Sequence, residues 1–416
     1  MDEFGAGIQH QRFTVHLARD GEIGIFDACC VHFQPPCVFG KRRAVQPLMN
    51  GALSHIATPN RAIVSLAAAL LKASSGSGTE PGGARIDWHR HAVDDRQLDW
   101  ILRAGLGPLL RWAASDGEGI PAHWSQPLLA ADLTARVRHA DLVATTVAVL
   151  DVCRDLRVEA TLLKGISVAD RLYPLAHMRP MADVDVLVPA DDEHRVAEEL
   201  LAHGFERIPY PDTPGQHHGA PLRHTRRRTL VELHIALFPV SAPVHGAAIF
   251  LPAHLHANRQ VSPYQGADAG HLSAEIQLAY IAAAWFNDMT TYRFHPSFLA
   301  SLFDAVLLLK ADGSTFDWDQ LLRPIDNEMV KASLYALLTY VTRFGTTPPP
   351  GQVLRRLADN GGLVGPLQRR LIHAALDRYL LGARVWSLPF PPPMPGRYSP
   401  RHQFEKRILR RRPRAA

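Results

Sequence analysis

The chain has little cysteine and no long apolar run. Its four cysteines, Cys29, Cys30, Cys37 and Cys153, are too few to build a disulfide framework in 416 residues. Crossing a bilayer takes about 20 consecutive apolar residues, and the longest apolar stretch, around residues 278–286, is far shorter. The opening MDEFGAGIQHQRF also lacks the charged-then-apolar pattern of a signal peptide. These absences predict a cytoplasmic protein without a transmembrane segment.

Lysine is also scarce, because arginine supplies most of the 45 basic residues. The few lysines are therefore noticeable, above all Lys164, which is close in sequence to an acidic motif. The formal net charge of +5 is modest, and the 47% hydrophobic and 20% charged residues are ordinary for a globular protein. A chain of this length has room for about two or three packed units.

The first 72 residues are expected to form a separate small module. Residues 12–27 alternate in hydropathy around Asp20-Gly21, which predicts a hairpin. Cys29, Cys30, His32 and Cys37 follow, but they lack the paired spacing of zinc sites, so a structural role is favoured over metal binding. A helix is predicted from residue 58 to 72. Residues 73–94 have the composition of a flexible linker.

The remaining chain divides by its hydrophobic pattern. Helical spacing of leucine and valine predicts a helical lead-in over 95–157. Short apolar runs predict an α/β core over 158–240, with an irregular stretch at 209–227 and a helix capped by Asp191. Helical patterns return over 241–385, and 386–416 is a proline-rich and basic tail. The tail could contact RNA or an anionic membrane surface, or be merely solvated.

The core centres on two acids in one predicted strand. Residues 161–163 read as a buried strand, a helix follows over 166–173, and 183–188 reads as a second strand. Side chains alternate across a strand, so Asp183 and Asp185 point to the same side. Two carboxylates on one face repel each other, and a divalent cation such as Mg²⁺ would relieve that repulsion. The alternative is a strand end with two solvated acids.

Three sequence blocks surround these acids. They are Leu163-Lys164-Gly165, residues 179–188 reading RPMADVDVLV, and Val231-Glu232-Leu233-His234. In this order they resemble the core of an uncharacterised bacterial nucleotidyltransferase family, which is part of the superfold that includes DNA polymerase beta. The resemblance covers about residues 95–350, and its middle block is the most specific. It implies a mixed sheet with flanking helices, followed by a mostly helical C-terminal domain.

The resemblance also implies roles for particular residues. Asp183, Asp185 and Glu232 are expected to hold Mg²⁺ or Mn²⁺ and to be catalytic. Lys164 and Gly165 stand where the superfold usually has Gly-Ser, and Ser167 follows. The expected nucleotide-binding residues are therefore Lys164, Gly165, Ser167 and Arg179. His234 is expected either to support a carboxylate or to take part in catalysis.

The predicted function is metal-dependent transfer of a nucleoside monophosphate from a nucleoside triphosphate to an acceptor. The acceptor stays open among a small molecule, a peptide, a protein and an RNA end. One alternative is a degenerate binding module without catalysis, since Gly-Ser is replaced. Another is a toxin–antitoxin-type transferase that acts on RNA. Residues 217–228, rich in histidine and arginine, and Asp304 are further candidates for substrate contact. The alternatives are a solvated basic loop and a capped or paired surface acid.

Overall fold

The structure is a computed structural model that describes residues 12–19, 22–29, 95–114, 120–210, 215–291, 298–312 and 315–379. The chain forms two compact units, Met1–His55 and Ile56–Ala416. The first contains an antiparallel hairpin of β1 (Arg12–Arg19) and β2 (Glu22–Cys29), as predicted. Cys30, His32 and Cys37, the predicted helix at 58–72, the linker at 73–94 and the tail at 386–416 lie outside the described residues.

The second unit is built on a seven-stranded sheet in the order β5-β6-β7-β4-β3-β9-β8. Its strands are β3 (Thr161–Leu162), β4 (Asp183–Leu187), β5 (Phe205–Arg207), β6 (Leu222–His224), β7 (Leu230–His234), β8 (Arg259–Tyr264) and β9 (Ala267–Leu272). β4 runs parallel to β7 and antiparallel to β3, and β3 runs parallel to β9. The other neighbouring strands are antiparallel. The predicted mixed α/β fold is confirmed.

Helices surround the sheet and make up most of the chain after it. Those before β3 are α2 (Asp95–Arg103), α3 (Gly107–Ala113) and α4 (Ser125–Asp155). Those between strands are α5 (Lys164–Leu172), the 3₁₀ turn η4 (Ala176–Met178), α6 (Glu193–Ala202) and α7 (Pro252–Ala257). After β9 come α8 (Ala274–Thr291), α9 (Phe298–Ala311), α10 (Trp318–Leu322), α11 (Glu328–Val341), α12 (Gly351–Ala358) and α13 (Pro366–Tyr379). None of the helices in the described ranges has both the length and the apolar composition to span a bilayer.

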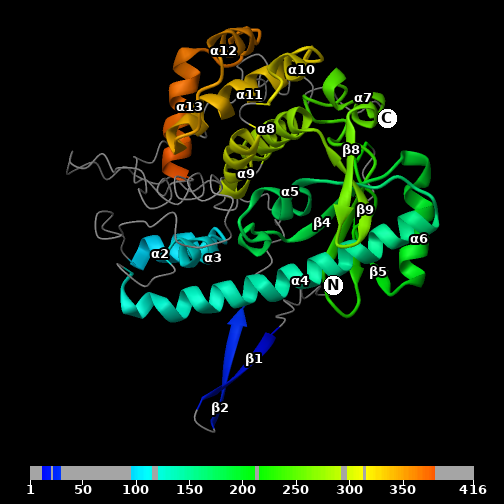
Figure 1. Ribbon diagram of the computed structural model, residues 1–416, viewed down its shortest axis with the longest axis vertical. Helices are drawn as coiled ribbons and strands as arrows, with labels where there is room; N and C mark the ends of the chain where they lie inside the picture. Colours follow the sequence, from blue (N-terminus) through cyan, green and yellow to red (C-terminus); the bar gives the residue numbers. More distant parts are fainter. Residues whose placement is uncertain are drawn as a thin grey trace, which may run out of the picture. The chain divides into compact units, whose positions relative to one another are not determined.

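The two sides of β4 and β7 have opposite character. Val184, Val186, Val231 and Leu233 are buried in a core shared with α4 and α6. The residues that alternate with them include Asp185 and Glu232, whose side chains point to the side of the sheet where α5 begins. α4 contacts β4, β9 and α6, whereas α8 contacts β9, α9 and α11 (Figure 1). A second, larger core joins α2 and α3 to α8, α9 and α11, and it includes Leu163 at the end of β3.

Several predicted elements differ in detail. The helix expected from Asp191 begins at Glu193 after a 3₁₀ turn, and neither acid there caps it through its side chain. β6 lies inside the stretch predicted to be irregular. Its Leu-Arg-His sequence contains a single apolar residue, the buried Leu222, so its hydropathy does not indicate a strand. The range predicted to be mostly helical also contains the hairpin β8–β9. Its Pro263 is tolerated because β8 is an edge strand.

Candidate functional site

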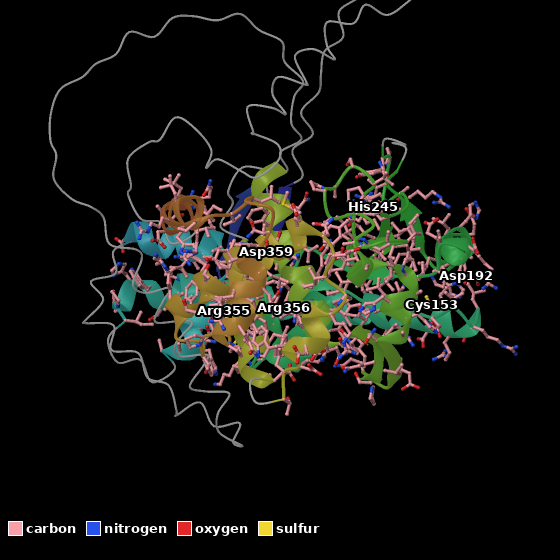
Figure 2. All side chains as sticks on the ribbon, turned by 90° about the horizontal axis from the view of Figure 1, so that it is seen from above. Cys153, Asp192, His245, Arg355, Arg356 and Asp359 are labelled. Atoms are coloured by element: carbon pink, nitrogen blue, oxygen red, sulfur yellow. The ribbon has the colours of Figure 1, made fainter. Side chains whose placement is uncertain are left out.

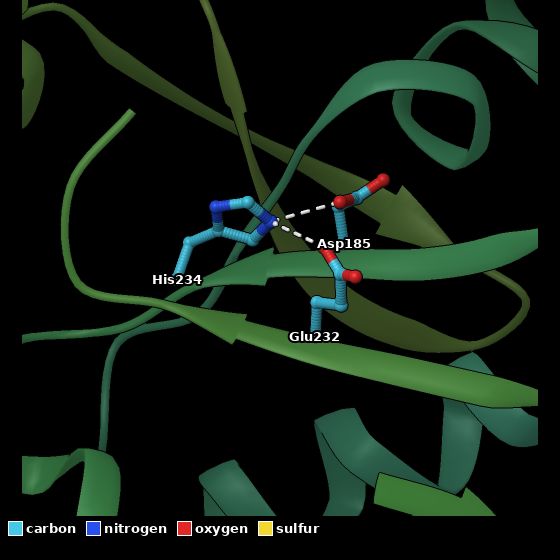
Figure 3. Close-up of side chains that lie close together, drawn as sticks. All are labelled: Asp185, Glu232 and His234. Atoms are coloured by element: carbon cyan, nitrogen blue, oxygen red, sulfur yellow. Dashed lines mark hydrogen bonds and ion pairs between the residues drawn. The ribbon is translucent and has the colours of Figure 1, made fainter. Parts of the chain in front are cut away.

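The register between β4 and β7 brings polar side chains together. Asp185 pairs with Glu232, and His234 lies two residues further along the same strand face. One ligand atom from each of Asp185, Glu232 and His234 lies within 4.8 Å of the others (Figure 3). Their opposite neighbours on both strands are apolar and packed on α4 and α6, which fixes the direction in which these three side chains point. The result is a compact group of two carboxylates and one imidazole.

His234 joins the two carboxylates. Its ring is fully buried, and its Nε2 lies 2.8 Å from Asp185 Oδ1 and 3.5 Å from Glu232 Oε2. Burial lowers the pKa of His234, but the hydrogen bonds to Asp185 and Glu232 outweigh it and raise the pKa above its usual value. Burial raises the pKa of Glu232, and the hydrogen bond with His234 contributes most to the net lowering. His234 therefore holds both acids in their ionised form.

Lys164 reaches the same carboxylate from the end of β3. Its Nζ lies 2.6 Å from Asp185 Oδ1, and its backbone has a left-handed φ of 47°, which is unfavourable for a residue with a side chain. Burial lowers the pKa of Lys164, but Asp185 above all raises it well beyond its usual value. Asp185 is only 2% exposed, and burial raises its pKa, yet Lys164 and His234 together keep the pKa low.

Asp183 lies two residues before Asp185 on the same face of β4 and is not part of the group formed by Asp185, Glu232 and His234. The described residues provide no hydrogen bond to its carboxylate, which is half-buried. Burial, followed by repulsion from Asp185, raises the pKa of Asp183 to about 6, although Lys164 partly opposes this. Glu232 adds to the repulsion. Asp183 is thus a desolvated carboxylate that lacks a partner of opposite charge in direct contact.

Gly165 opens helix α5 next to this cluster. A Cβ on Gly165 would lie 2.5 Å from Met181 Cγ and 2.6 Å from Arg179 Nη1. The absence of a side chain therefore allows residues 179–181 to pack directly on the first turn of α5. Ser167 is buried on that helix, with its Oγ 3.3 Å from His271 Nδ1 rather than beside the carboxylates.

Arg179 is held within the protein by two groups. Its Nε and Nη2 donate to the Asp304 carboxylate at 3.2 and 2.7 Å, and its Nη1 donates to the Pro180 carbonyl at 2.7 Å. The Tyr173 hydroxyl donates to Asp304 at 2.7 Å. The alternative of a capped or paired surface acid is right about the pairing, with Arg179, but wrong about the surface position, because Asp304 is 2% exposed. Among the four expected nucleotide-binding residues, Lys164 is the one whose side chain contacts the carboxylate cluster, through Asp185.

Two further histidines lie against the cluster. The rings of His217 and His218 lie 5.1 and 5.4 Å from the ring of His234, and His218 pairs with His234 in an isolated bridge. Burial, followed by the neighbouring His234, lowers the pKa of His217 to about 3, so its ring is neutral at physiological pH. The start of the histidine-rich segment thus adjoins the acids. Tyr280 of α8 also interacts with Lys164, and no sequence signal indicated that residue.

Cys153 does not take part in this chemistry. It is buried in α4, and Figure 2 shows it near Asp192, at the start of α6. Burial, with a smaller contribution from Asp192, raises the pKa of the thiol to about 12. The thiolate, which is the nucleophilic form, is therefore almost absent at neutral pH.

Acids on two adjacent strands of a mixed sheet are the arrangement that the resemblance to the nucleotidyltransferase superfold implies. A family model described as "Uncharacterised nucleotidyltransferase" matches residues 91–345, and the chain belongs to that family. No curated protein and no solved structure matches the chain.

Proposed function

We propose that the protein transfers a nucleoside monophosphate from a nucleoside triphosphate to an acceptor, with the help of a divalent cation. The observation that carries this proposal is the group of Asp185, Glu232 and His234 on adjacent strands, with the half-buried Asp183 beside it. Membership of the nucleotidyltransferase family supports the reaction class.

The side chains present fit a divalent cation. Asp185, Glu232 and His234 offer two oxygen donors and one nitrogen donor within 4.8 Å of one another. Burial, followed by repulsion from Asp185, raises the pKa of the half-buried Asp183 to about 6, and a cation would favour its ionised form. The oxygen donors suit Mg²⁺ or Mn²⁺, and His234, whose Nε2 is hydrogen-bonded to Asp185, would orient that carboxylate. A bound cation would neutralise phosphate oxygens and favour ionisation of the attacking group.

The protein's own residues would then align the reactants. An oxygen of the acceptor forms a bond to the α-phosphorus, the bond from that phosphorus to the bridging oxygen breaks, and pyrophosphate leaves. Lys164 would exchange Asp185 for the triphosphate, since its side chain is 38% exposed and can turn outwards. Glu232 would accept the proton of the acceptor, while His234 keeps Asp185 in place. Arg179 would hold residues 179–181 against α5 rather than contact phosphate.

A second candidate is nucleotide binding without catalysis. The observation that favours it is the 2.6 Å contact between Lys164 and Asp185, because an ammonium group here already neutralises the most buried acid. A protein of this kind would bind a nucleotide reversibly and leave it unchanged.

Transfer of a radioactive label separates the two candidates. The protein is incubated with α-labelled ATP, GTP, CTP or UTP, Mg²⁺ or Mn²⁺, and a cell extract as the source of acceptors. We expect a labelled product that survives denaturation and disappears with Asp185→Asn. Exposed Asp191 provides the matched control, since Asp191→Asn should leave the product unchanged. Label that binds but is always recovered as intact triphosphate would favour the binding module.

A further inference from the structure

A cavity of about 380 Å³ lies apart from the carboxylate cluster. Its walls are the corner between α2 and α3, the middle of α4, and residues 177–181 between η4 and β4. None of Lys164, Asp183, Asp185 and Glu232 lines it. Its volume falls within the range of about 300–1,000 Å³ that is typical of small-molecule sites.

Small side chains on α3 and α4 produce this space. A Cβ on Gly107 would lie 2.8 Å from the Cβ of Ala131, so the two helices approach closely at one end of the cavity. Ala131 and Ala135 lie one turn apart on α4 and face the opening, and the remaining wall is largely glycine, proline and leucine. These residues present an apolar surface with room for a ligand body.

One side of the cavity carries basic groups. Arg138 is exposed, its Nη2 lies 3.5 Å from the Ala182 carbonyl, and no carboxylate in the described ranges lies within ion-pair distance of it. His139 Nδ1 is buried and lacks a hydrogen-bond partner in the described part of the chain. Among the described residues that line the cavity, none is acidic. Arg138 is therefore the lining cation without an ion-pair partner in the described ranges, since Arg179 is paired with Asp304.

The neighbouring acids are engaged elsewhere. Asp132 behind the wall accepts hydrogen bonds from Arg111 at 2.6 Å, Arg136 at 3.0 Å and the cavity residue His177 at 2.9 Å. Asp170 is 3.8 Å from the other nitrogen of His139 and offers that ring only a long contact. Burial lowers the pKa of His139, Asp170 raises it, and His177 lowers it further.

We propose that this cavity binds a small molecule that combines an apolar body with one anionic group. The body packs on Ala131 and Ala135, and the anionic group lies at Arg138, whose guanidinium would donate charge-assisted hydrogen bonds to it. A cationic ligand is disfavoured, because it would meet Arg138 without a compensating carboxylate. The nucleic acid or protein partners considered for the acceptor are too large for this space.

Fluorescence titration with anilinonaphthalene sulfonate, an aromatic body with one sulfonate, tests the assignment in the full-length protein. The titrations contain neither nucleotide nor metal, so their outcome is independent of the proposed transfer reaction. We expect one saturable site. Hexanoate should displace the probe at concentrations about tenfold lower than hexanol or hexylamine does, since only hexanoate provides the anionic group. Equal displacement by hexylamine would overturn the anionic assignment, and absence of a saturable site would overturn the proposal.

Two pairs of variants locate the probe. Ala135→Leu fills the cavity and should weaken binding at least about tenfold, whereas Ala140→Leu on the exposed side of the same helix should not. Arg138→Gln should weaken hexanoate about tenfold and hexanol little, whereas Arg154→Gln, an exposed arginine near the end of α4, should change neither. Unchanged affinities in both Ala135→Leu and Arg138→Gln would place the probe elsewhere. If Ala135→Leu does not fold, the comparison of Arg138→Gln with Arg154→Gln decides alone.

Discussion

Replacing Asp183 with asparagine should stabilise the protein when no metal is present. The Asp183 carboxylate is half-buried beside Asp185 and Glu232, and its pKa rises from 3.8 to about 6 on folding. Between these values the folded state binds more protons than the unfolded state, so stability falls as the pH rises through that window. A shift of about two units corresponds to roughly 2–3 kcal/mol at neutral pH. Asparagine keeps the shape and removes the charge.

Urea denaturation with a chelator present, at pH values from 4 to 8, measures this effect. We expect Asp183→Asn to be more stable than the natural protein by up to about 2–3 kcal/mol at pH 7.5, with the difference vanishing near pH 4. Excess Mn²⁺ should stabilise the natural protein and have less effect on the variant. Asp191→Asn, which changes an exposed acid, provides the baseline. A variant that is less stable than the natural protein at pH 7.5 without metal would refute the repulsion argument.

Three further predictions follow from direct contacts. Lys164→Met should lower the metal-free stability by about 1–3 kcal/mol, because the buried Asp185 loses an ion-pair partner, and should weaken triphosphate binding by about one to two decades; denaturation and calorimetry measure these. Asp304→Ala should cost about 3–5 kcal/mol in a urea melt, because Arg179 is left buried and unpaired. Gly165→Ala should cost about 1–3 kcal/mol in the same assay, since its Cβ would clash with the neighbouring segment.

Matched substitutions provide the controls. Lys331→Met on α11, Asp319→Ala at a side chain 77% exposed, and Gly351→Ala at the open start of α12 should each change stability by less than about 0.5 kcal/mol. Lost stability with unchanged nucleotide affinity in Lys164→Met would remove the phosphate role from that lysine. A fully stable Asp304→Ala or Gly165→Ala would contradict the packing described around residues 179–181.

Local sequence patterns were sufficient to predict the centre of the sheet. β4 and β7 are rich in valine and leucine, and their alternation determines which side Asp185 and Glu232 face. β9 escaped prediction because its Ala-Asp-Ala-Gly-His-Leu sequence has little β propensity. It forms a strand through pairing with β3 and β8, and that tertiary context cannot be read from a local window.

The same distinction applies to the candidate site. The chemistry of adjacent carboxylates is visible in a short motif, which predicts Asp183 and Asp185, whereas the roles of Glu232 and Lys164 follow from the family resemblance. The partner of Arg179 was not, because Asp304 lies 125 residues away on α9. The contacts of His217 with His234 likewise depend on how a loop folds back on β7. Contacts between residues far apart in the sequence therefore determine the roles of Arg179 and His217.

Calorimetry of nucleotide binding tests the central claim most directly. ATP and GTP are titrated into the natural protein and into Asp185→Asn, each with a chelator and then with excess Mg²⁺ or Mn²⁺. If the carboxylate cluster binds the triphosphate through a divalent cation, the metal should increase affinity at least about tenfold in the natural protein, and this gain should largely disappear in the variant. Equal affinity with and without metal in the natural protein would contradict the account.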